Sequence, residues 1–161
     1  MKKLISVFVV FIGMMTATQM VNAQTGVFIN VRGQFIAGTV TGGSTPICYN
    51  INPGLLTSSI PTGGNGVYTY QWQDSISGGT WNNIIGQTAL TYNPGTLTAN
   101  RSFRIVYNDL CGTLNSNKIN IVVYLKFNAG TIGNPQTICY NTQPNALVNI
   151  ILPSGGDGTY T

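Results

Sequence analysis

The sequence contains no histidine and no glutamate, and charged residues make up only 6% of its 161 positions. Without histidine it can form neither a Ser-His-Asp nor a Cys-His catalytic arrangement. Its three carboxylates are isolated: we expect Asp74 in the turn after a strand, Asp109 in a loop and Asp157 in a Gly-rich turn. They form no obvious acid-base pair. A metal centre is disfavoured because the sequence also lacks a Cys-x-x-Cys motif. We therefore expect no catalytic, cofactor-binding or metal site, and no enzyme.

Long apolar runs are also missing after the N-terminus. Lys2 and Lys3 precede an apolar run over residues 4–15, and a plausible cleavage site follows Ala23. This pattern predicts a secretory signal peptide over 1–23 and a short leader over 24–34. The alternative, an N-terminal membrane anchor, is disfavoured because the apolar run is short. No later segment is apolar enough to cross a membrane, so we expect a secreted or cell-surface protein.

The positive net charge comes from a scarcity of acidic residues and not from a cluster of basic ones. Seven Lys and Arg residues stand against three acidic ones, and two of the lysines leave with the predicted signal peptide, which gives a mature net charge of +2. Nucleic acid is therefore not an expected partner. Asn, Thr, Ser, Gln and Gly interleave with Ile, Val and Tyr, a composition that indicates an all-β extracellular chain.

Three sequence blocks occur twice in the same order. The second copies begin 92, 91 and 92 residues after the first. The pairs are 35–40 with 127–132, 47–50 with 138–141, and 61–69 with 153–161. We interpret 35–126 as one complete repeat and 127–161 as a partial second repeat, too short to bury a core alone. We expect a C-terminal truncation; the alternative is a short protein whose tail is disordered or docks on a neighbour.

Alternating residues predict about seven strands in the first repeat. The segment 67–73 places Tyr68, Tyr70 and Trp72 on one face, as in a half-buried antiparallel strand. The other strands are expected at 35–40, 47–50, 81–84, 89–92, 101–107 and 118–124, with Cys111 in a loop over 108–116. Strands with turns every 8 to 12 residues favour a Greek-key β-sandwich.

The junction between the repeats contains no Gly, Pro or Ser-rich linker, since residues 122–127 read Val-Val-Tyr-Leu-Lys-Phe. The last strand of one repeat should therefore run almost directly into the first strand of the next. This favours a semi-rigid rod in which neighbouring repeats are each other's partners.

Several motifs together resemble a known family. They include Gly-Gly-x-Gly-x-Tyr-Thr-Tyr-Gln-Trp-Gln at 63–73, Gly-Thr-Trp-Asn-Asn-Ile-Ile-Gly at 79–86 and Cys-Gly-Thr at 111–113. These motifs resemble the immunoglobulin-like or PKD-like tandem repeats of Bacteroidetes cell-surface proteins. The resemblance implies an immunoglobulin-like antiparallel β-sandwich in an exported adhesin or a gliding-motility-associated protein.

The three cysteines are Cys48, Cys111 and Cys139. Secreted chains usually oxidise their thiols, so we expect a disulfide between Cys48 and Cys111 within the first repeat. Two free thiols or a metal site are the alternatives. Cys139 is then unpaired because the second repeat lacks a counterpart of Cys111.

Exposed aromatic residues could contact a ligand. Trp72 shares its face with two tyrosines and is expected in the core. Trp81, which precedes two asparagines, is the better candidate for contact with an extracellular glycan or protein.

Two functional hypotheses follow. The first is a non-enzymatic structural repeat in the stalk of a surface adhesin or motility-associated protein. The second is an accessory or carbohydrate-binding domain of an exported polysaccharide-degrading enzyme.

Overall fold

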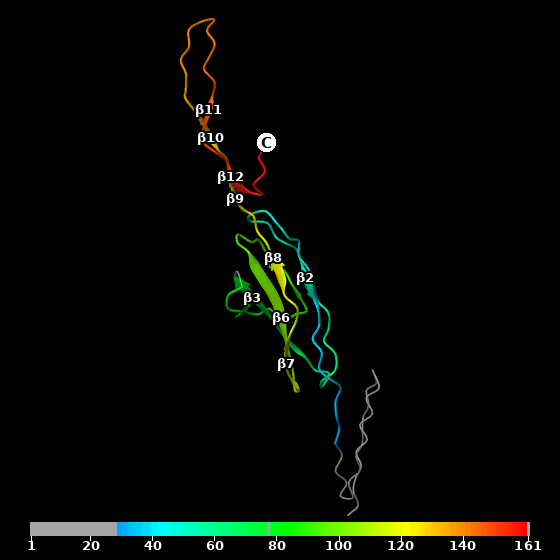
Figure 1. Ribbon diagram of the computed structural model, residues 1–161. Helices are drawn as coiled ribbons and strands as arrows, with labels where there is room; N and C mark the ends of the chain where they lie inside the picture. Colours follow the sequence, from blue (N-terminus) through cyan, green and yellow to red (C-terminus); the bar gives the residue numbers. More distant parts are fainter. Residues whose placement is uncertain (1–28, 77, 161) are drawn as a thin grey trace, which may run out of the picture.

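The structure, a computed structural model, describes residues 29–76 and 78–160, and the chain is all-β (Figure 1). The predicted signal peptide and part of the leader lie outside these residues. The first repeat forms two antiparallel sheets. The smaller sheet has the order β1-β2-β5, with β1 at Val40–Gly42, β2 at Leu56–Ser58 and β5 at Thr91–Tyr92.

The larger sheet is five-stranded and has the order β4-β3-β6-β7, with β8 also paired to β6. Its strands are β3 (Thr69–Ile76), β4 (Asn82–Asn83), β6 (Arg101–Asp109), β7 (Gly112–Asn115) and β8 (Ile119–Ile121). Both sheets contribute to one core, so the predicted β-sandwich is confirmed. The buried apolar side chains are Val40, Ile47, Leu56, Trp72, Leu97, Phe103, Ile105, Tyr107, Ile121 and Val123.

The pair β3 and β6 is the centre of the larger sheet. The two strands stay in register over all eight residues of β3, and Trp72 lies opposite Ile105. Alternation buries Trp72 as predicted, and its indole Nε1 donates a hydrogen bond to the Ala89 carbonyl at 2.8 Å. The strand begins two residues later and ends three residues later than expected, because pairing with β6 extends to Ile76.

The predicted loop over 108–116 is wrong. Strand β6 continues to Asp109, and a two-residue turn containing Cys111 leads directly into β7. Between β7 and β8, Ser116 maintains contact with β6, since its backbone N–H donates to the Ile105 carbonyl at 2.9 Å. Strands β7 and β8 therefore act as one interrupted edge strand.

An asparagine side chain ties this edge to the smaller sheet. The Val40 backbone N–H donates to Asn117 Oδ1 at 2.7 Å, and Asn117 Nδ2 donates to the Val40 carbonyl at 2.9 Å. The Asn117 amide thus makes the two hydrogen bonds to Val40 that the backbone of a neighbouring strand would otherwise make. Val40 is the β1 residue whose side chain enters the core.

Several predicted strands are shorter than expected. Only Ile36 of the first block makes a bridge before β1, and only two residues pair in each of β4 and β5. The predicted strand at 47–50 is a single bridge between Ile47 and Val123 followed by a turn, in which Asn50 has a positive φ of 62°. The left-handed backbone at Asn50 is incompatible with a continuing strand.

Residues 125–156 form two small ladders beyond one end of the first repeat (Figure 1). Strand β9 (Leu125–Asn128) pairs with β12 (Ser154–Gly156), and β10 (Thr131–Gly133) pairs with β11 (Val148–Ile151). We call residues 125–160 the half-repeat. Its local contacts copy those of the first repeat: Phe35 packs on Tyr68, and Phe127 packs on Tyr160.

Candidate functional site

Trp81, the predicted ligand contact, immediately precedes β4 and is half-buried instead of freely exposed. The guanidinium carbon of Arg104 lies 4.3 Å from the centroid of its ring. This is a cation–π contact, which attracts a cation to the negative face of the indole ring. One face of Trp81 is therefore already covered by the protein itself.

Arg104 belongs to a row of polar side chains that crosses the larger sheet. Its Nε donates to Gln73 Oε1 at 2.8 Å, and Gln73 Nε2 donates to Asn83 Oδ1 at 2.9 Å. Strand register explains the row, because Gln73 lies opposite both Arg104 on β6 and Asn83 on β4. The neighbours Trp72 and Ile105 point into the core, so this row lies on the outer face of the sheet.

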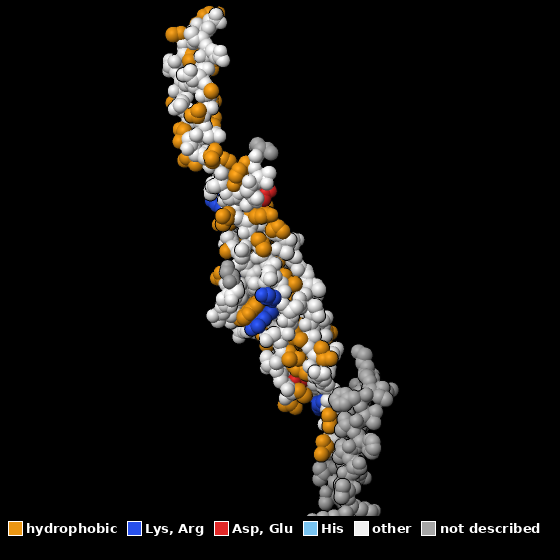
Figure 2. All heavy atoms as spheres, viewed as in Figure 1, with side chains coloured by type: hydrophobic (Ala, Val, Ile, Leu, Met, Phe, Trp, Pro, Cys, Tyr) orange, Lys and Arg blue, Asp and Glu red, His pale blue; other side chains and the backbone are white. Residues whose placement is uncertain are grey.

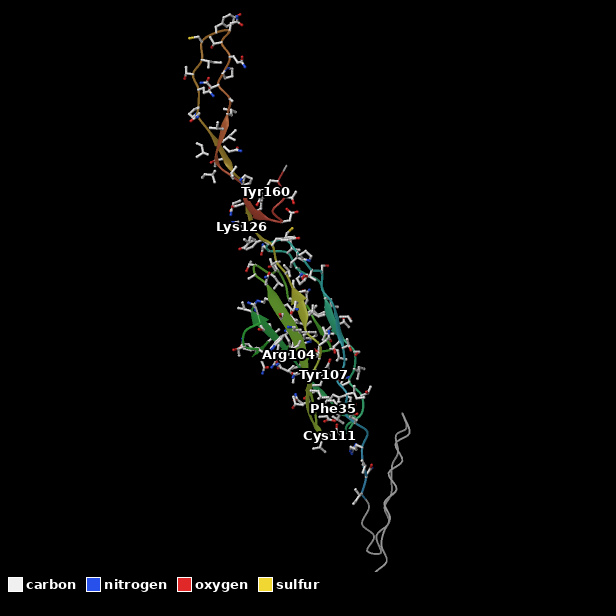
Figure 3. All side chains as sticks on the ribbon, viewed as in Figure 1. Phe35, Arg104, Tyr107, Cys111, Lys126 and Tyr160 are labelled. Atoms are coloured by element: carbon white, nitrogen blue, oxygen red, sulfur yellow. The ribbon has the colours of Figure 1, made fainter. Side chains whose placement is uncertain are left out.

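We call these four side chains, Trp81, Arg104, Gln73 and Asn83, the outer row. Figure 2 shows basic side chains over the middle of the first repeat, where Figure 3 places Arg104. Burial lowers the pKa of the Arg104 guanidinium from its ordinary value. An indole ring, a guanidinium and two amides are groups that can stack on and hydrogen-bond a hydroxylated ligand.

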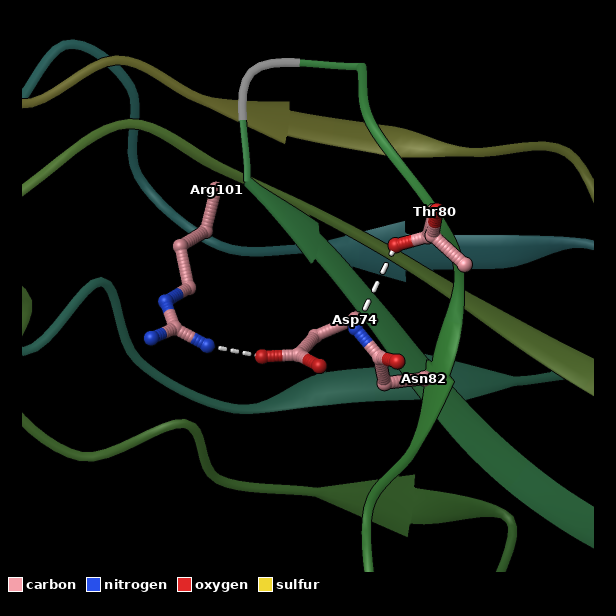
Figure 4. Close-up of polar contacts among 4 residues, drawn as sticks. All are labelled: Asp74, Thr80, Asn82 and Arg101. Atoms are coloured by element: carbon pink, nitrogen blue, oxygen red, sulfur yellow. Dashed lines mark hydrogen bonds and ion pairs between the residues drawn. The ribbon is translucent and has the colours of Figure 1, made fainter.

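Asp74 lies within β3, not in the turn after the strand as expected, and forms an ion pair with Arg101 (Figure 4). The pair lines a pocket of about 230 Å³ together with Tyr92, Pro94, Thr96, Leu97, Thr98 and Phe103. Burial and the nearby Asp74 carboxylate raise the pKa of Tyr92, while Arg101 opposes this shift. The charge of Asp74 is balanced by that of Arg101, which suits a structural role near the end of β3.

The other two aspartates stabilise turns. Asp109 accepts hydrogen bonds from the backbone N–H groups of Asn65, Cys111 and Gly112. Asp157 accepts one from Thr159 at 3.0 Å. Each carboxylate thus satisfies backbone donors in its own turn, and Asp109 also satisfies one in the turn over 63–66.

The predicted disulfide between Cys48 and Cys111 is wrong for the first repeat, where both cysteines are free and exposed. Cys48 follows Ile47, which bonds to Val122 and Tyr124 beyond the Arg101 end of β6. Cys111 lies in the turn after Asp109, at the opposite end of β6. The nine residues of β6 span roughly 26 Å at the usual rise per residue, far beyond the reach of a disulfide.

The sequence pattern singled out Trp81 as a candidate contact but not its neighbour Arg104. Alternation in 101–107 sets Arg104 opposite to the apolar face, and this signal was available. Its contact with Trp81 depends on the pairing of β4 with β3, which the sequence alone does not fix.

Among the described residues, no helix has the length and apolar character needed to span a membrane. No curated protein and no solved structure matches the chain. Residues 36–125 match a family described as a domain of unknown function, DUF8696. The match begins at the bridge residue Ile36 and ends at Leu125, where β9 starts. The chain therefore belongs to the DUF8696 family.

Proposed function

We propose that the chain is a non-enzymatic structural module of a secreted or cell-surface protein, in which immunoglobulin-like repeats stack end to end as a stalk. One observation carries this proposal. The Tyr124 N–H donates to the Ile47 carbonyl within the first repeat, and the next residue, Leu125, already pairs with Gly156 of the half-repeat. The two units are thus joined without a spacer.

This arrangement restricts motion between repeats. A hinge needs residues whose φ and ψ are free to change, and here adjacent residues are held on opposite sides of the junction. Val123 is anchored as well, since its N–H donates to Asn100 Oδ1 at 2.7 Å. Stacked repeats with such junctions favour a stiff rod, which can hold a binding element away from a cell surface.

Small-angle X-ray scattering on a chain with a completed second repeat tests the stalk. Thr161 corresponds to Thr69, so residues 70–126 can be appended after Thr161 to complete the sandwich. We expect the scattering of a rigid rod. The matched control carries a Gly-Ser linker inserted after Tyr124 and should scatter as two mobile units. Identical scattering from both chains would contradict the stalk.

Export is part of the same proposal. Expression of the full chain in a bacterial host should give a mature protein that begins at Gln24, checked by N-terminal sequencing of the exported fraction. An uncleaved, membrane-bound product would favour an anchor over 1–23 instead.

The outer row supports a second candidate, an accessory carbohydrate-binding domain of an exported enzyme. The observation in its favour is the combination of a half-buried indole ring, a guanidinium and amides on the outer face of one sheet. A glycan array probed with the chain and with Trp81→Ala tests this candidate. Binding lost only in the variant supports it, and absence of binding by both removes it.

A further inference from the structure

Cys48 lies at the end of the first repeat that meets the half-repeat. Its neighbour Ile47 donates to the Val122 carbonyl and accepts from the Tyr124 N–H, both at 2.9 Å. Tyr124 directly precedes β9. Cys48 is exposed there, so its thiol is available at the junction.

Cys111 lies at the other end, beside the turn over residues 63–66. The link is Asp109, which accepts the Cys111 N–H at 2.6 Å through Oδ1 and the Asn65 N–H at 2.9 Å through Oδ2. The preceding residue, Gly64, donates to the Gly33 carbonyl at 2.9 Å. Figure 3 shows Cys111 and Phe35 at this end, with Lys126 and Tyr160 at the opposite one.

Because the sequence repeats, the surroundings of Cys111 should recur at the junction between the repeats. Gly33 and Gly64 correspond to Leu125 and Gly156, which are paired between β9 and β12. The turn is also reproduced in detail: Tyr68 Oη donates to the Gly63 carbonyl at 2.7 Å, and Tyr160 Oη donates to the Gly155 carbonyl at 2.7 Å. The place occupied by Cys111 in the first repeat therefore recurs beside Leu125, close to Cys48.

We propose that Cys48 of one repeat forms a disulfide with the cysteine at the Cys111 position of the following repeat. The inference rests on the proposed end-to-end stacking. It explains why the two cysteines lie at opposite ends of one repeat and why both are exposed. It also assigns Cys139, which occupies the Cys48 position of the second repeat, to the next junction. The bond would lock each junction covalently.

Formation of the bond requires an oxidant, which we take to be a disulfide donor in the extracytoplasmic compartment. The Cys48 thiolate attacks one donor sulfur, and the first donor thiol leaves. The second cysteine's thiolate then attacks the Cys48 sulfur of this mixed disulfide, and the second donor thiol leaves. The two protein thiols are oxidised, and the donor disulfide is reduced to two thiols that carry the protons.

The test uses the completed chain described above, which contains the three native cysteines and the added copy of Cys111. After equilibration with oxidised and reduced glutathione, thiol titration should find two of these four thiols free. Peptide mapping under non-reducing conditions should link the Cys48 peptide to the added cysteine. Cys48→Ser should abolish this link, whereas Cys111→Ser in the first repeat is the matched control and should leave it intact.

The outcome is separable from that of the stalk proposal. Four free thiols in a chain that scatters as a rod overturn the inference and leave the stalk standing. Flexible scattering of both the completed chain and its Cys48→Ser variant contradicts the stalk itself. If the completed chain does not fold, a second design joins residues 29–126 directly to residues 35–126. All core residues of the first repeat lie within this range, so the unit holds its own core. Four free thiols in that folded chain overturn the inference, whereas two free thiols support it.

Discussion

The first repeat and the half-repeat share their local geometry but differ in burial. Leu56 is fully buried, whereas Leu147, at the corresponding position, is 63% exposed. Val40 is 1% exposed and its counterpart Ile132 is 66% exposed. The turns nevertheless agree, since Asn50 and Asn141 have φ angles of 62° and 61°. Turn geometry is thus determined by nearby residues, whereas burial depends on the second sheet.

The reason lies in which contacts each feature needs. Asn tolerates the left-handed backbone region, so the turn forms without distant partners. Gly63 and Gly155 likewise have positive φ and leave no space for a Cβ against the carbonyls of Gln34 and Lys126. In contrast, Leu56 and Val40 pack against side chains from β3, β6 and β8. The half-repeat contains no counterpart of these strands.

The largest expected effect comes from truncating the two matched leucines. Leu56→Ala should lower the free energy of unfolding of the first repeat by about 2–5 kcal/mol, because it removes buried methyl groups and leaves a cavity. Leu147→Ala should change it by less than about 0.5 kcal/mol, since that side chain is solvated. Urea denaturation followed by tryptophan fluorescence measures both, as both tryptophans lie in the first repeat.

A large loss from Leu147→Ala would contradict the difference in burial between the two regions. It would mean that the apolar face of the half-repeat is covered in solution. Analytical ultracentrifugation of the wild-type chain would then show whether a second copy provides the cover.

Features set by alternation and turn chemistry could be predicted from the sequence. The strands β3 and β6 and the burial of Trp72 are examples. Features set by pairing could not. The smaller sheet depends on which short segments meet β2, and two-residue strands such as β4 carry almost no periodic signal. The predicted disulfide was wrong for the same reason, because placement within one repeat says nothing about which end of the sandwich a cysteine occupies.

The site was predictable only in part. Trp81 was recognised from its residue type, but the outer row exists because β4, β3 and β6 place three polar side chains side by side. Asp74 was assigned to a turn because acidic residues are common there. Its ion pair with Arg101 follows from pairing near the end of β3, where Ile76 lies opposite Arg101.

The side chain of Asn117 links the two sheets of the first repeat, and the half-repeat has no such link. Asn117→Ala should lower the free energy of unfolding by about 2 kcal/mol, because the Val40 N–H and carbonyl both lose their partner in a part-buried site. Chemical denaturation measures the loss. Asn120→Ala, on the exposed side of β8, is the control and should have little effect. Equal losses would show that Asn117 has no special role in closing the sandwich.

Tyr107 sharpens the comparison through pH, because no counterpart of this buried residue exists in the half-repeat. Burial raises the pKa of Tyr107 above its ordinary value of 10.0, the hydrogen bond with Ser58 opposes this shift, and a negative charge on Tyr70 adds to it. Above about pH 10 the unfolded chain therefore releases a proton that the folded chain retains. The free energy of unfolding should fall as the pH rises through this range.

Tyr107→Phe removes this titration and should flatten the alkaline part of the stability curve. At neutral pH the same variant should cost about 1 kcal/mol, since it removes the 2.6 Å hydrogen bond between Tyr107 Oη and Ser58 Oγ. Denaturation curves recorded from pH 7 to pH 11 measure both effects. An unchanged alkaline slope in the variant would assign the loss of stability to other groups, with Tyr92 the first to test.

Arg104 should give the smallest effect and separates binding from stability on the outer face. Arg104→Ala should cost about 0.5–1 kcal/mol, because a partly exposed cation–π contact and one hydrogen bond to Gln73 are lost. A double-mutant cycle with Trp81→Ala measures the coupling between the two side chains. Coupling near zero would show that the stacked pair does not contribute to the free energy of unfolding. The position of Trp81 would then be set by the turn between β3 and β4 alone. Coupling of the expected size would make the outer row a rigid feature that the core of the first repeat holds in place, and that the half-repeat, without β3, β4 and β6, cannot build.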